Sequence, residues 1–487
     1  MKNVRRILGV FLLVHSVAIG QVVEIHQIDV GTGDATLINV KNNLGTIQHS
    51  ILIDAGETNR DQEVIDYLHA NAKKNGAYVQ LDYIITSHYH SDHYGGMVGH
   101  KETLYQTVGG GNKRRRCGEI YTGVLADTTI KYFAVLDKGT SSPSSQSNLY
   151  KKYNTLAGAR RTPVGTTTVG NFGAVNSITP TATFPPPNPT AAQQLSLGGY
   201  IDLGADVNGT PIRLRLVVAN AKVYAPGVNM NTYNVADTLG VSKSYTGNGA
   251  RPNPNNWGLG WVLEYGAFRY YTAGDIGGYN GSYGSCTSCG SNYFDIETPL
   301  AAALQLIYTN PNNSTGHICS QKLSHHGSCC STNPTFWGTL RPSSGIISAG
   351  HVASFGHPTQ EVITRIETQN WAADSLRGTT LDNYLMTELW FQNRNIDLSK
   401  GGTSGSISLV ATQLVIPPTD IDTAYLMANG SSLYELKSTV PQKYGDVIIK
   451  VSATNAGFPI AQQSRYSIEY VDYLGNNQTL NFNCHGQ

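Results

Sequence analysis

LDYIITSHYHSDHYGG, residues 81–96, is the stretch that most constrains the structure of this chain. Its first part, LDYIITS, is a short apolar run typical of a buried strand. Three histidines and one aspartate then follow within six residues, at His88, His90, Asp92 and His93. Imidazole nitrogen and carboxylate oxygen are ligands that Zn²⁺ or Mn²⁺ accepts in an open site. Because His88 and His90 are two residues apart, an extended backbone places both rings on one side. The stretch predicts a metal centre at the end of a strand.

The sequence on either side alternates between strand-like and helix-like patterns. Residues 22–56 contain three alternating runs, VVEIHQIDV, ATLINV and SILIDAG, and residues 60–75 read as a helix. Strand-like runs return at 200–224 and at 260–275, the second a hairpin that pivots at Gly266. LQLIYTN, KLSHHGS and GIISAG each read as a short strand that meets a polar turn. This order of elements indicates a layered α/β domain.

Composition and the first residues indicate where the protein works. Charged residues make up 14% of the chain and the formal net charge is +1, so overall charge selects no polyanionic partner. Residues 1–20 read as a secretory signal peptide, with a basic start, an apolar run over 7–19 and a cut expected ahead of Gln21. We therefore expect a secreted protein with no transmembrane segment in the mature chain.

The texture of the chain suggests its domain organisation. A main domain is expected over 21–412, with a loop-rich insertion at about 100–195, where Gly, Pro, Ser and Thr are frequent. After about residue 412 the β-like runs carry no clustered His or Asp. We predict a small β-rich C-terminal domain over 413–487.

The seven cysteines favour disulfides, because exported proteins meet an oxidising environment. Their odd number leaves at least one unpaired or bridged to another chain. Cys286 and Cys289 form a C-x-x-C pair, but the sequence has no second pair at zinc-knuckle spacing. A local disulfide or loop staple is therefore favoured over a metal role for this pair.

Six separated motifs resemble the metallo-β-lactamase superfamily. SHYHSDHYGG resembles its H-x-H-x-D-H signature. Five further motifs resemble the ComEC-like branch of competence-related hydrolases: IDVGTGDATLI (28–38), ILIDAG (51–56), YYTAGDI (270–276), KLSHHGS (322–328) and SAGHVASFGHP (348–358). The phosphorylcholine esterases of bacterial surfaces share several of them. The resemblance implies an α/β fold, the αββα metallo-β-lactamase sandwich, here with a small C-terminal β-rich accessory domain.

The resemblance also implies a role for each matching residue. Two divalent metal ions, Zn²⁺ or Mn²⁺, would be held by His88 and His90 on one side, by Asp92, His93 and His326 on the other, and by Asp275 between them. His325 and His357 would face the substrate. Asp29 and Asp34 would lie behind the ligands and orient their imidazoles. The implied catalytic residues are Asp92, Asp275, His325 and His357.

The sequence departs from the superfamily pattern in two places. Most members place a third histidine on the first ion, but this chain has no histidine between His100 and His317. NPNNWGLGWVLEY (253–265) resembles the Asn-containing segment that the ComEC-like branch has there, so water or an asparagine oxygen could fill the position and the metal identity stays open. Ala353 also stands where the branch usually has asparagine, which weakens the expected substrate contact.

The implied activity is hydrolysis by a metal-bridging hydroxide, with a phosphodiester as substrate and DNA as one candidate. The basic run Lys113–Arg116 could contact phosphates or could be a solvated turn. Tyr89 and Tyr94 could stack on a base or a choline, or pack beside the motif. Two alternatives stay open: a phosphorylcholine-type esterase or lactone or β-lactam hydrolase, and a non-catalytic metal-binding surface protein.

Overall fold

The computed structural model describes the chain in several stretches. The main ones are 22–98, 197–224, 254–278, 295–308, 318–349, 446–452, 465–471 and 477–483, with short gaps at residue 32, at residues 76–77 and at residue 220. Isolated residues between 289 and 365 and eight short strands elsewhere are also described. The predicted signal peptide and most of the loop-rich insertion lie outside the described residues.

The first sheet contains the strands predicted near the N-terminus. Its order is β24-β23-β22-β1-β2-β3-β6-β9. The first three strands in sequence form an antiparallel meander, and β3, β6 and β9 are parallel. Their bounds are β1 Val22–Gln27, β2 Thr36–Lys41, β3 Ile47–Ile53, β6 Tyr83–Thr86, β9 Lys131–Ala134, β22 Val447–Ser452, β23 Arg465–Val471 and β24 Asn477–Asn483. The strands predicted within 22–56 and 81–87 are confirmed.

The second sheet has the order β10-β11-β12-β15-β16-β17-β18-β19, with β13 and β14 attached to β12. β15 and β16 form the predicted hairpin, and Gly266 at its turn has a φ of 58°. The strands β16 to β19 are parallel. The bounds are β10 Thr183–Phe184, β11 Tyr200–Ala205, β12 Pro211–Ala219, β13 Lys222–Tyr224, β14 Thr232–Asn234, β15 Gly260–Tyr265, β16 Phe268–Ala273, β17 Ser320–Lys322, β18 Ser344–Ile347 and β19 Asn383–Met386.

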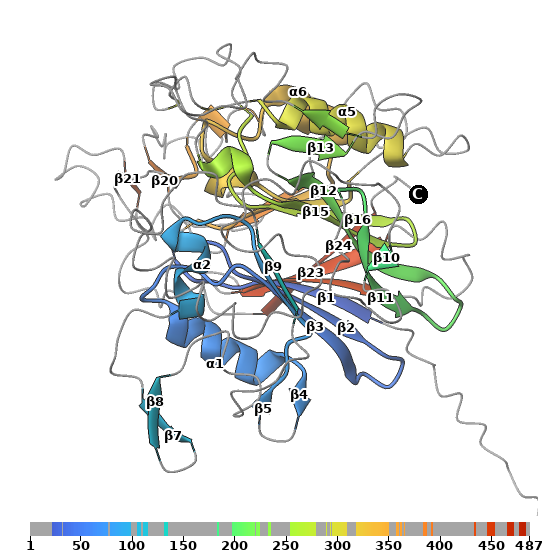
Figure 1. Cartoon of the computed structure of the whole chain (residues 1–487). Coiled ribbons are helices and arrows are strands. Elements are labelled where there is room, and N and C mark those ends of the chain that lie inside the picture. The colour runs from blue at the N-terminus through green and yellow to red at the C-terminus, as the bar shows by residue number, and fades with distance from the viewer. Residues whose placement is uncertain are drawn as a thin grey trace, which may run out of the picture.

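The helices lie on the outer faces of the two sheets, α1 and α2 beside the first and α5 and α6 beside the second (Figure 1). Within the described residues, no helix is long and apolar enough to cross a membrane. The helical bounds are α1 Asp61–Asn71, α2 Ser91–Val98, α5 Glu297–Tyr308, α6 Pro334–Leu340, and the short 3-10 helices η4 Pro254–Trp257 and η5 Ser324–Gly327. Three two-stranded ribbons complete the description: β4 Lys74–Asn75 with β5 Tyr78–Val79, β7 Tyr105–Val108 with β8 Gly111–Arg114, and β20 Phe391–Gln392 with β21 Leu433–Tyr434.

LQLIYTN was expected to be a strand, and this prediction is wrong. Leu304 to Tyr308 form the last part of α5. The run is short and apolar when read alone, but the preceding residues continue a helical pattern in which Leu300, Ala301 and Leu304 are buried. Asp295 accepts a hydrogen bond from Thr298 N (2.9 Å) and so stabilises the start of the helix.

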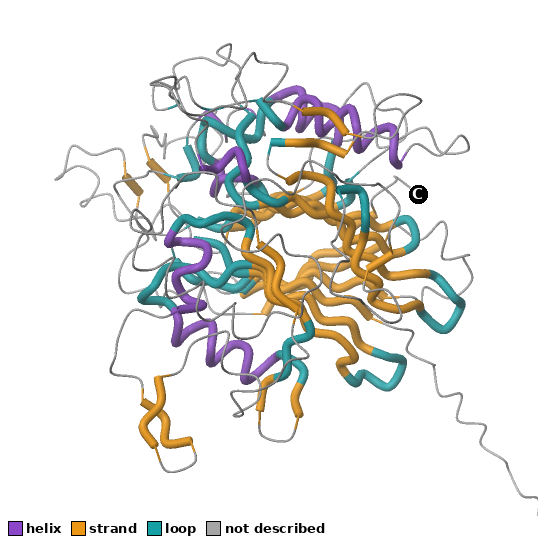
Figure 2. Tube along the Cα trace, viewed as in Figure 1, coloured by secondary structure: helices purple, strands orange, loops and turns teal. Residues whose placement is uncertain are grey.

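Alternating burial along the strands produces four layers, and Figure 2 shows the two strand layers between the helices. Ile51 and Ile53 of β3 lie in the core between the sheets, whereas Leu52 packs toward α1. In the second sheet, Tyr270 faces the inter-sheet core and Tyr271 faces α5 and α6. A shift of one residue in register would exchange the two faces, so the burial pattern fixes the pairing. The mixed α/β architecture with two sheets is consistent with a metallo-β-lactamase fold.

The C-terminal strands differ from the separate domain expected over 413–487. β22 pairs antiparallel with β1, and β23 and β24 continue the first sheet outward. Tyr466 of β23 also contacts the second sheet, since its hydroxyl donates to the Cys319 carbonyl (2.8 Å). Alternation in the sequence identifies these strands but not their partner, which is the free edge of β1 that only the folded chain presents.

Candidate metal centre

The candidate ligands come from strand ends that meet at one edge of the sandwich. His88 and His90 follow β6, and Asp92 and His93 begin α2. Asp275 follows β16, and His326 follows β17. Because β16 and β17 are adjacent parallel strands, their carboxyl ends lie at the same edge. Six residues separated by up to 238 positions are thereby brought together.

One group of side chains surrounds the Oδ1 atom of Asp275. His93 Nε2 lies 3.1 Å and His326 Nε2 lies 3.6 Å from this oxygen. Asp92 Oδ2 is 3.2 Å from His326 Nε2 and 3.7 Å from His93 Nε2. We call these four residues the second group, and their converging nitrogen and oxygen atoms are suited to a divalent cation.

A first group lies on the other oxygen of Asp275. His88, His90 and Asp275 each offer one ligand atom, and these atoms lie within 4.8 Å of one another. His88 Nε2 is 3.7 Å from Asp275 Oδ2. Asp275 therefore presents one oxygen to each group, which is the geometry that a carboxylate shared by two cations requires.

A layer of hydrogen bonds behind the ligands fixes their ring orientation. Asp54 Oδ2 accepts from His93 Nδ1 (2.9 Å) and from Ser87 Oγ (2.5 Å), and Asp54 Oδ1 accepts from Ser87 N (2.7 Å). Ser87 Oγ lies 3.2 Å from His88 Nδ1. The Ser348 carbonyl accepts from His326 Nδ1 (2.8 Å). Because these Nδ1 atoms face the outer layer, the Nε2 atoms of the rings face the carboxylates of the two groups.

Asp34 lies behind the second group, whereas the described contacts of Asp29 are with Gly31 and Asp446. Asp34 Oδ1 is 3.4 Å from His326 Nδ1, and Asp34 Oδ2 is 3.6 Å from His93 Nδ1. Asp34 also pairs with the ammonium of Lys322. Asp34 also offers an oxygen within 4.8 Å of ligand atoms of His93, Asp275 and His326, but we assign it an outer position because it faces the Nδ1 atoms. Asp29 accepts a hydrogen bond from Gly31 N (3.0 Å) and shapes the turn between these two residues.

The residues expected to face substrate lie beside the first group. His325 Nε2 is 3.7 Å from Asp275 Oδ2 and 3.4 Å from Asn255 Nδ2. The His357 ring contacts the His325 ring edge-on at 5.1 Å, and the Tyr293 ring stacks on His325 at 6.0 Å. His325 and His326 both have a left-handed φ of 52°, which lets two consecutive imidazoles reach the same site.

Buried carboxylates and imidazoles control the charge of the centre. Burial disfavours charge on every one of these groups, yet the neighbouring imidazoles hold the pKa of Asp275 well below its usual range. Burial likewise opposes protonation of His326, but Asp275 and Asp34 raise its pKa to about 10. Burial lowers the pKa of His325 to about 4. The second group thus needs positive charge, which protons or metal ions can supply.

Three buried ligand atoms are consistent with metal binding. His88 Nε2, His93 Nε2 and Asp275 Oδ1 make no hydrogen bond within the part of the chain that the structure describes. Buried polar atoms normally have a partner, so atoms of this kind within the two groups favour a bound cation. The nitrogen and oxygen donors fit divalent metal, and both groups offer candidate ligands for it.

Several residues singled out in the sequence lie elsewhere. Tyr94 is buried in the core beneath α1 and its ring packs edge-on against Tyr89 at 5.6 Å, so it packs beside the motif rather than stacking on a ligand. Lys113 and Arg114 end β8, in a ribbon that Figure 1 shows apart from α2. Arg115 and Arg116 lie outside the described residues.

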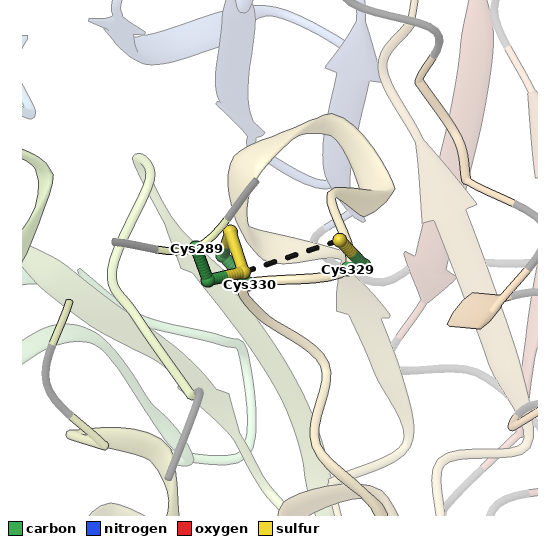
Figure 3. Close-up of side chains that lie close together, drawn as sticks. All are labelled: Cys289, Cys329 and Cys330. Carbon is green, nitrogen blue, oxygen red and sulfur yellow. Dashed lines mark hydrogen bonds between the residues drawn. A yellow bond between two sulfur atoms is a disulfide. The ribbon is translucent and has the colours of Figure 1, made fainter. Parts of the chain in front are cut away.

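A disulfide joins Cys289 to Cys330, 41 positions away, rather than to Cys286 within the same C-x-x-C pair (Figure 3). Cys319 and Cys329 each take part in a disulfide as well. Cys329 Sγ lies 3.9 Å from Cys289 Sγ. The closeness of Cys289, Cys329 and Cys330 is therefore explained by disulfides and not by a metal. The bond fixes the segment before α5 to the turn that follows His326.

The sequence reasoning missed three residues of this centre. Asp54 lies in the quoted motif ILIDAG, Ser87 precedes the first ligand and Lys322 opens KLSHHGS. A carboxylate at a strand end and a lysine at the start of a motif with two histidines were the available signals.

Comparison with known proteins supports the same centre. No curated protein matches the chain. Members of the metallo-beta-lactamase superfamily are generally metal-dependent hydrolases that use divalent metals. Residues 29–107, which include β2, β3, β6 and the four candidate ligands that follow β6, match the family model of that superfamily.

Proposed function

We propose that this protein is a secreted hydrolase of the ComEC-like branch that uses two metal ions to cleave phosphodiesters, DNA among them. One observation carries the proposal: Asp275 offers Oδ1 to His93 and His326 and Oδ2 to His88. A shared carboxylate between two groups of imidazoles is what a two-metal hydrolase needs to hold its ions about 3.5–4 Å apart. The match to the superfamily model and the two candidate metal groups support the more general activity, that of a metal-dependent hydrolase.

The residues of the centre have different proposed roles according to their position. His88, His90, Asp92, His93, Asp275 and His326 would hold Zn²⁺ or Mn²⁺, and the bound ions would supply a water nucleophile at neutral pH. His325 and His357 lie on the substrate side of Asp275. His325 is neutral at pH 7, because burial lowers its pKa to about 4, so it can donate one hydrogen bond to a phosphoryl oxygen or a leaving group.

The substrate assignment rests on the motifs and on the shape of the first group. That group has two histidines, and the sequence has no histidine between His100 and His317 that could supply a third. Asn255 lies beside His325 instead, in the segment that resembles the ComEC-like branch. This arrangement favours a phosphodiester over a β-lactam ring. Export is supported by the cysteine pairing, because disulfides persist in oxidising compartments.

The test is a substrate panel with the zinc- or manganese-loaded protein: bis(p-nitrophenyl) phosphate, supercoiled plasmid, p-nitrophenyl phosphorylcholine, an aryl lactone and a chromogenic β-lactam. We expect turnover of the first and nicking of the second, both lost in the Asp92→Ala, His93→Ala double variant. Turnover of p-nitrophenyl phosphorylcholine alone would support the esterase. Turnover of the lactone or the β-lactam alone would support a ring hydrolase. Metal binding without any turnover would support the non-catalytic protein.

A further inference from the structure

Lys322 is a fully buried lysine beneath the candidate metal centre. Its side chain is 1% exposed, its ammonium donates to the Ala273 carbonyl (2.8 Å) and to the Leu323 carbonyl (3.4 Å), and it forms an ion pair with Asp34. These three acceptors match the three hydrogens of the ammonium group. Burying a charged pair costs several kcal/mol per ion, on the order of the whole stability of a domain, so its location calls for a reason.

Two partners of Lys322 lie in segments that carry ligands of the second group, and the third, Asp34, lies in a turn that is hydrogen-bonded to Asp92. Ala273 ends β16, two residues before Asp275. Lys322 itself ends β17, four residues before His326. Asp34 lies in the turn before β2, and its backbone N–H donates to the Asp92 carbonyl (3.0 Å). Lys322 therefore joins the half of the centre carried by the first sheet to the half carried by the second.

Asp34 lies farther from the two ring nitrogens than their nearest acceptors do. His93 Nδ1 already donates to Asp54 at 2.9 Å and His326 Nδ1 to Ser348 O at 2.8 Å, whereas Asp34 is 3.6 and 3.4 Å from these nitrogens. Its carboxylate thus acts on both imidazoles through its charge and its place in the turn. Lys322 is the cation paired with that carboxylate.

We propose that Lys322 is a positioning residue that brings the two halves of the second group into register before a cation binds. This inference rests on the proposed metal site. Without the ammonium, Asp34 and the β16 and β17 ends lose their common partner, and Asp92, Asp275 and His326 no longer converge at ligand distance. Loss of a residue behind metal ligands typically weakens metal binding 10- to 100-fold.

The experiment compares Lys322→Met, Asp34→Asn and the double variant in the full chain. Zn²⁺ affinity is measured by competition with a chromophoric chelator, the thermal midpoint is measured on the metal-free protein, and Co²⁺ loading reports ligand geometry through its visible spectrum. Arg215→Met is the matched control, because Arg215 pairs with Glu264 (2.5 Å) in the second sheet. It should lower the midpoint and leave Zn²⁺ affinity unchanged.

We expect both single variants to lose 10- to 100-fold in Zn²⁺ affinity and to change the Co²⁺ spectrum. The double variant should regain thermal stability, because no unpaired charge is left, but not affinity, because the connection between the halves is still absent. Wild-type affinity in folded Lys322→Met protein, or recovery of affinity in the double variant, would overturn the inference. Tight Zn²⁺ binding by the wild type without phosphodiester turnover would refute only the proposed function, and absence of metal binding by the wild type would refute both.

Discussion

Replacing Asp54 by asparagine tests how the centre orients His93. In the native site, Asp54 accepts from His93 Nδ1, from Ser87 Oγ and from Ser87 N, at 2.9, 2.5 and 2.7 Å. The side-chain amide of the asparagine has only one oxygen that can accept a hydrogen bond. If that oxygen accepts from Ser87 N, the NH₂ group of the asparagine faces His93. His93 then keeps its proton on Nε2, the atom that faces Asp92 and Asp275 and that a cation needs unprotonated.

The backbone should tolerate the change. Asp54 has a left-handed φ of 57°, a conformation that asparagine adopts readily. The expected effect is therefore confined to the side-chain contacts. A residue behind a metal ligand contributes about 10- to 100-fold in affinity, which corresponds to about 1.4–2.8 kcal/mol for one of the two ions.

The assay is Zn²⁺ binding by chelator competition, with metal stoichiometry determined in parallel. Asp82→Asn is the matched control. Asp82 accepts from Ser50 N (2.9 Å) and pairs with Lys73 (3.0 Å) at the opposite end of β6, away from the ligands. We expect one weakened site in Asp54→Asn and two native sites in Asp82→Asn. Two native affinities in Asp54→Asn, or an equal loss in both variants, would refute the reasoning.

Two further outcomes follow from buried groups near the centre. Burial raises the pKa of Glu297 to about 8 from an ordinary value of 4.5, although Thr332 N and Asn333 N donate hydrogen bonds to its carboxyl group. The folded state therefore keeps a proton that the unfolded chain releases above pH 4.5. Between pH 4.5 and pH 8, the contribution of Glu297 to the free energy of unfolding should fall by about 1.4 kcal/mol per pH unit. The Glu297→Gln variant should lack that slope when stability is measured by urea unfolding. Parallel pH profiles of the wild type and the variant would contradict this. Cys289→Ser with Cys330→Ser opens a 41-residue separation and should lower the free energy of unfolding by up to about 4 kcal/mol, and an unchanged denaturation midpoint would argue against a stabilising role for this bond.

Local pattern was sufficient to predict most of the described strands and the core of the metal motif. Alternating apolar residues identified β1 to β3, β11 to β13 and the β15–β16 hairpin. His88 to His93 had to lie close together because they are adjacent in the chain. The motif resemblance carried the inference to Asp275 and His326, which the structure brings within 3.6 Å of each other.

Sequence pattern failed where the outcome depends on a distant partner. LQLIYTN is apolar in either a strand or a helix, and only the burial of Leu300 and Leu304 against the second sheet favours the helix of α5. Cys289 could bond to any cysteine, and the turn after His326 places Cys330 beside it. Asp54 is an ordinary acidic residue after a strand until His93 approaches from 39 positions away.

The sequence alone determined most of the segments that become strands and the side chains that can bind a cation, because both properties are local: burial alternates along a strand, and imidazole and carboxylate carry their own lone pairs. The tertiary structure alone decided that β22 closes on β1, that Lys322 reaches Asp34 and that Asp275 shows one oxygen to each group of histidines. These pairings join residues far apart in the chain. They depend on the order and register of strands within two packed sheets, which no short stretch of residues encodes.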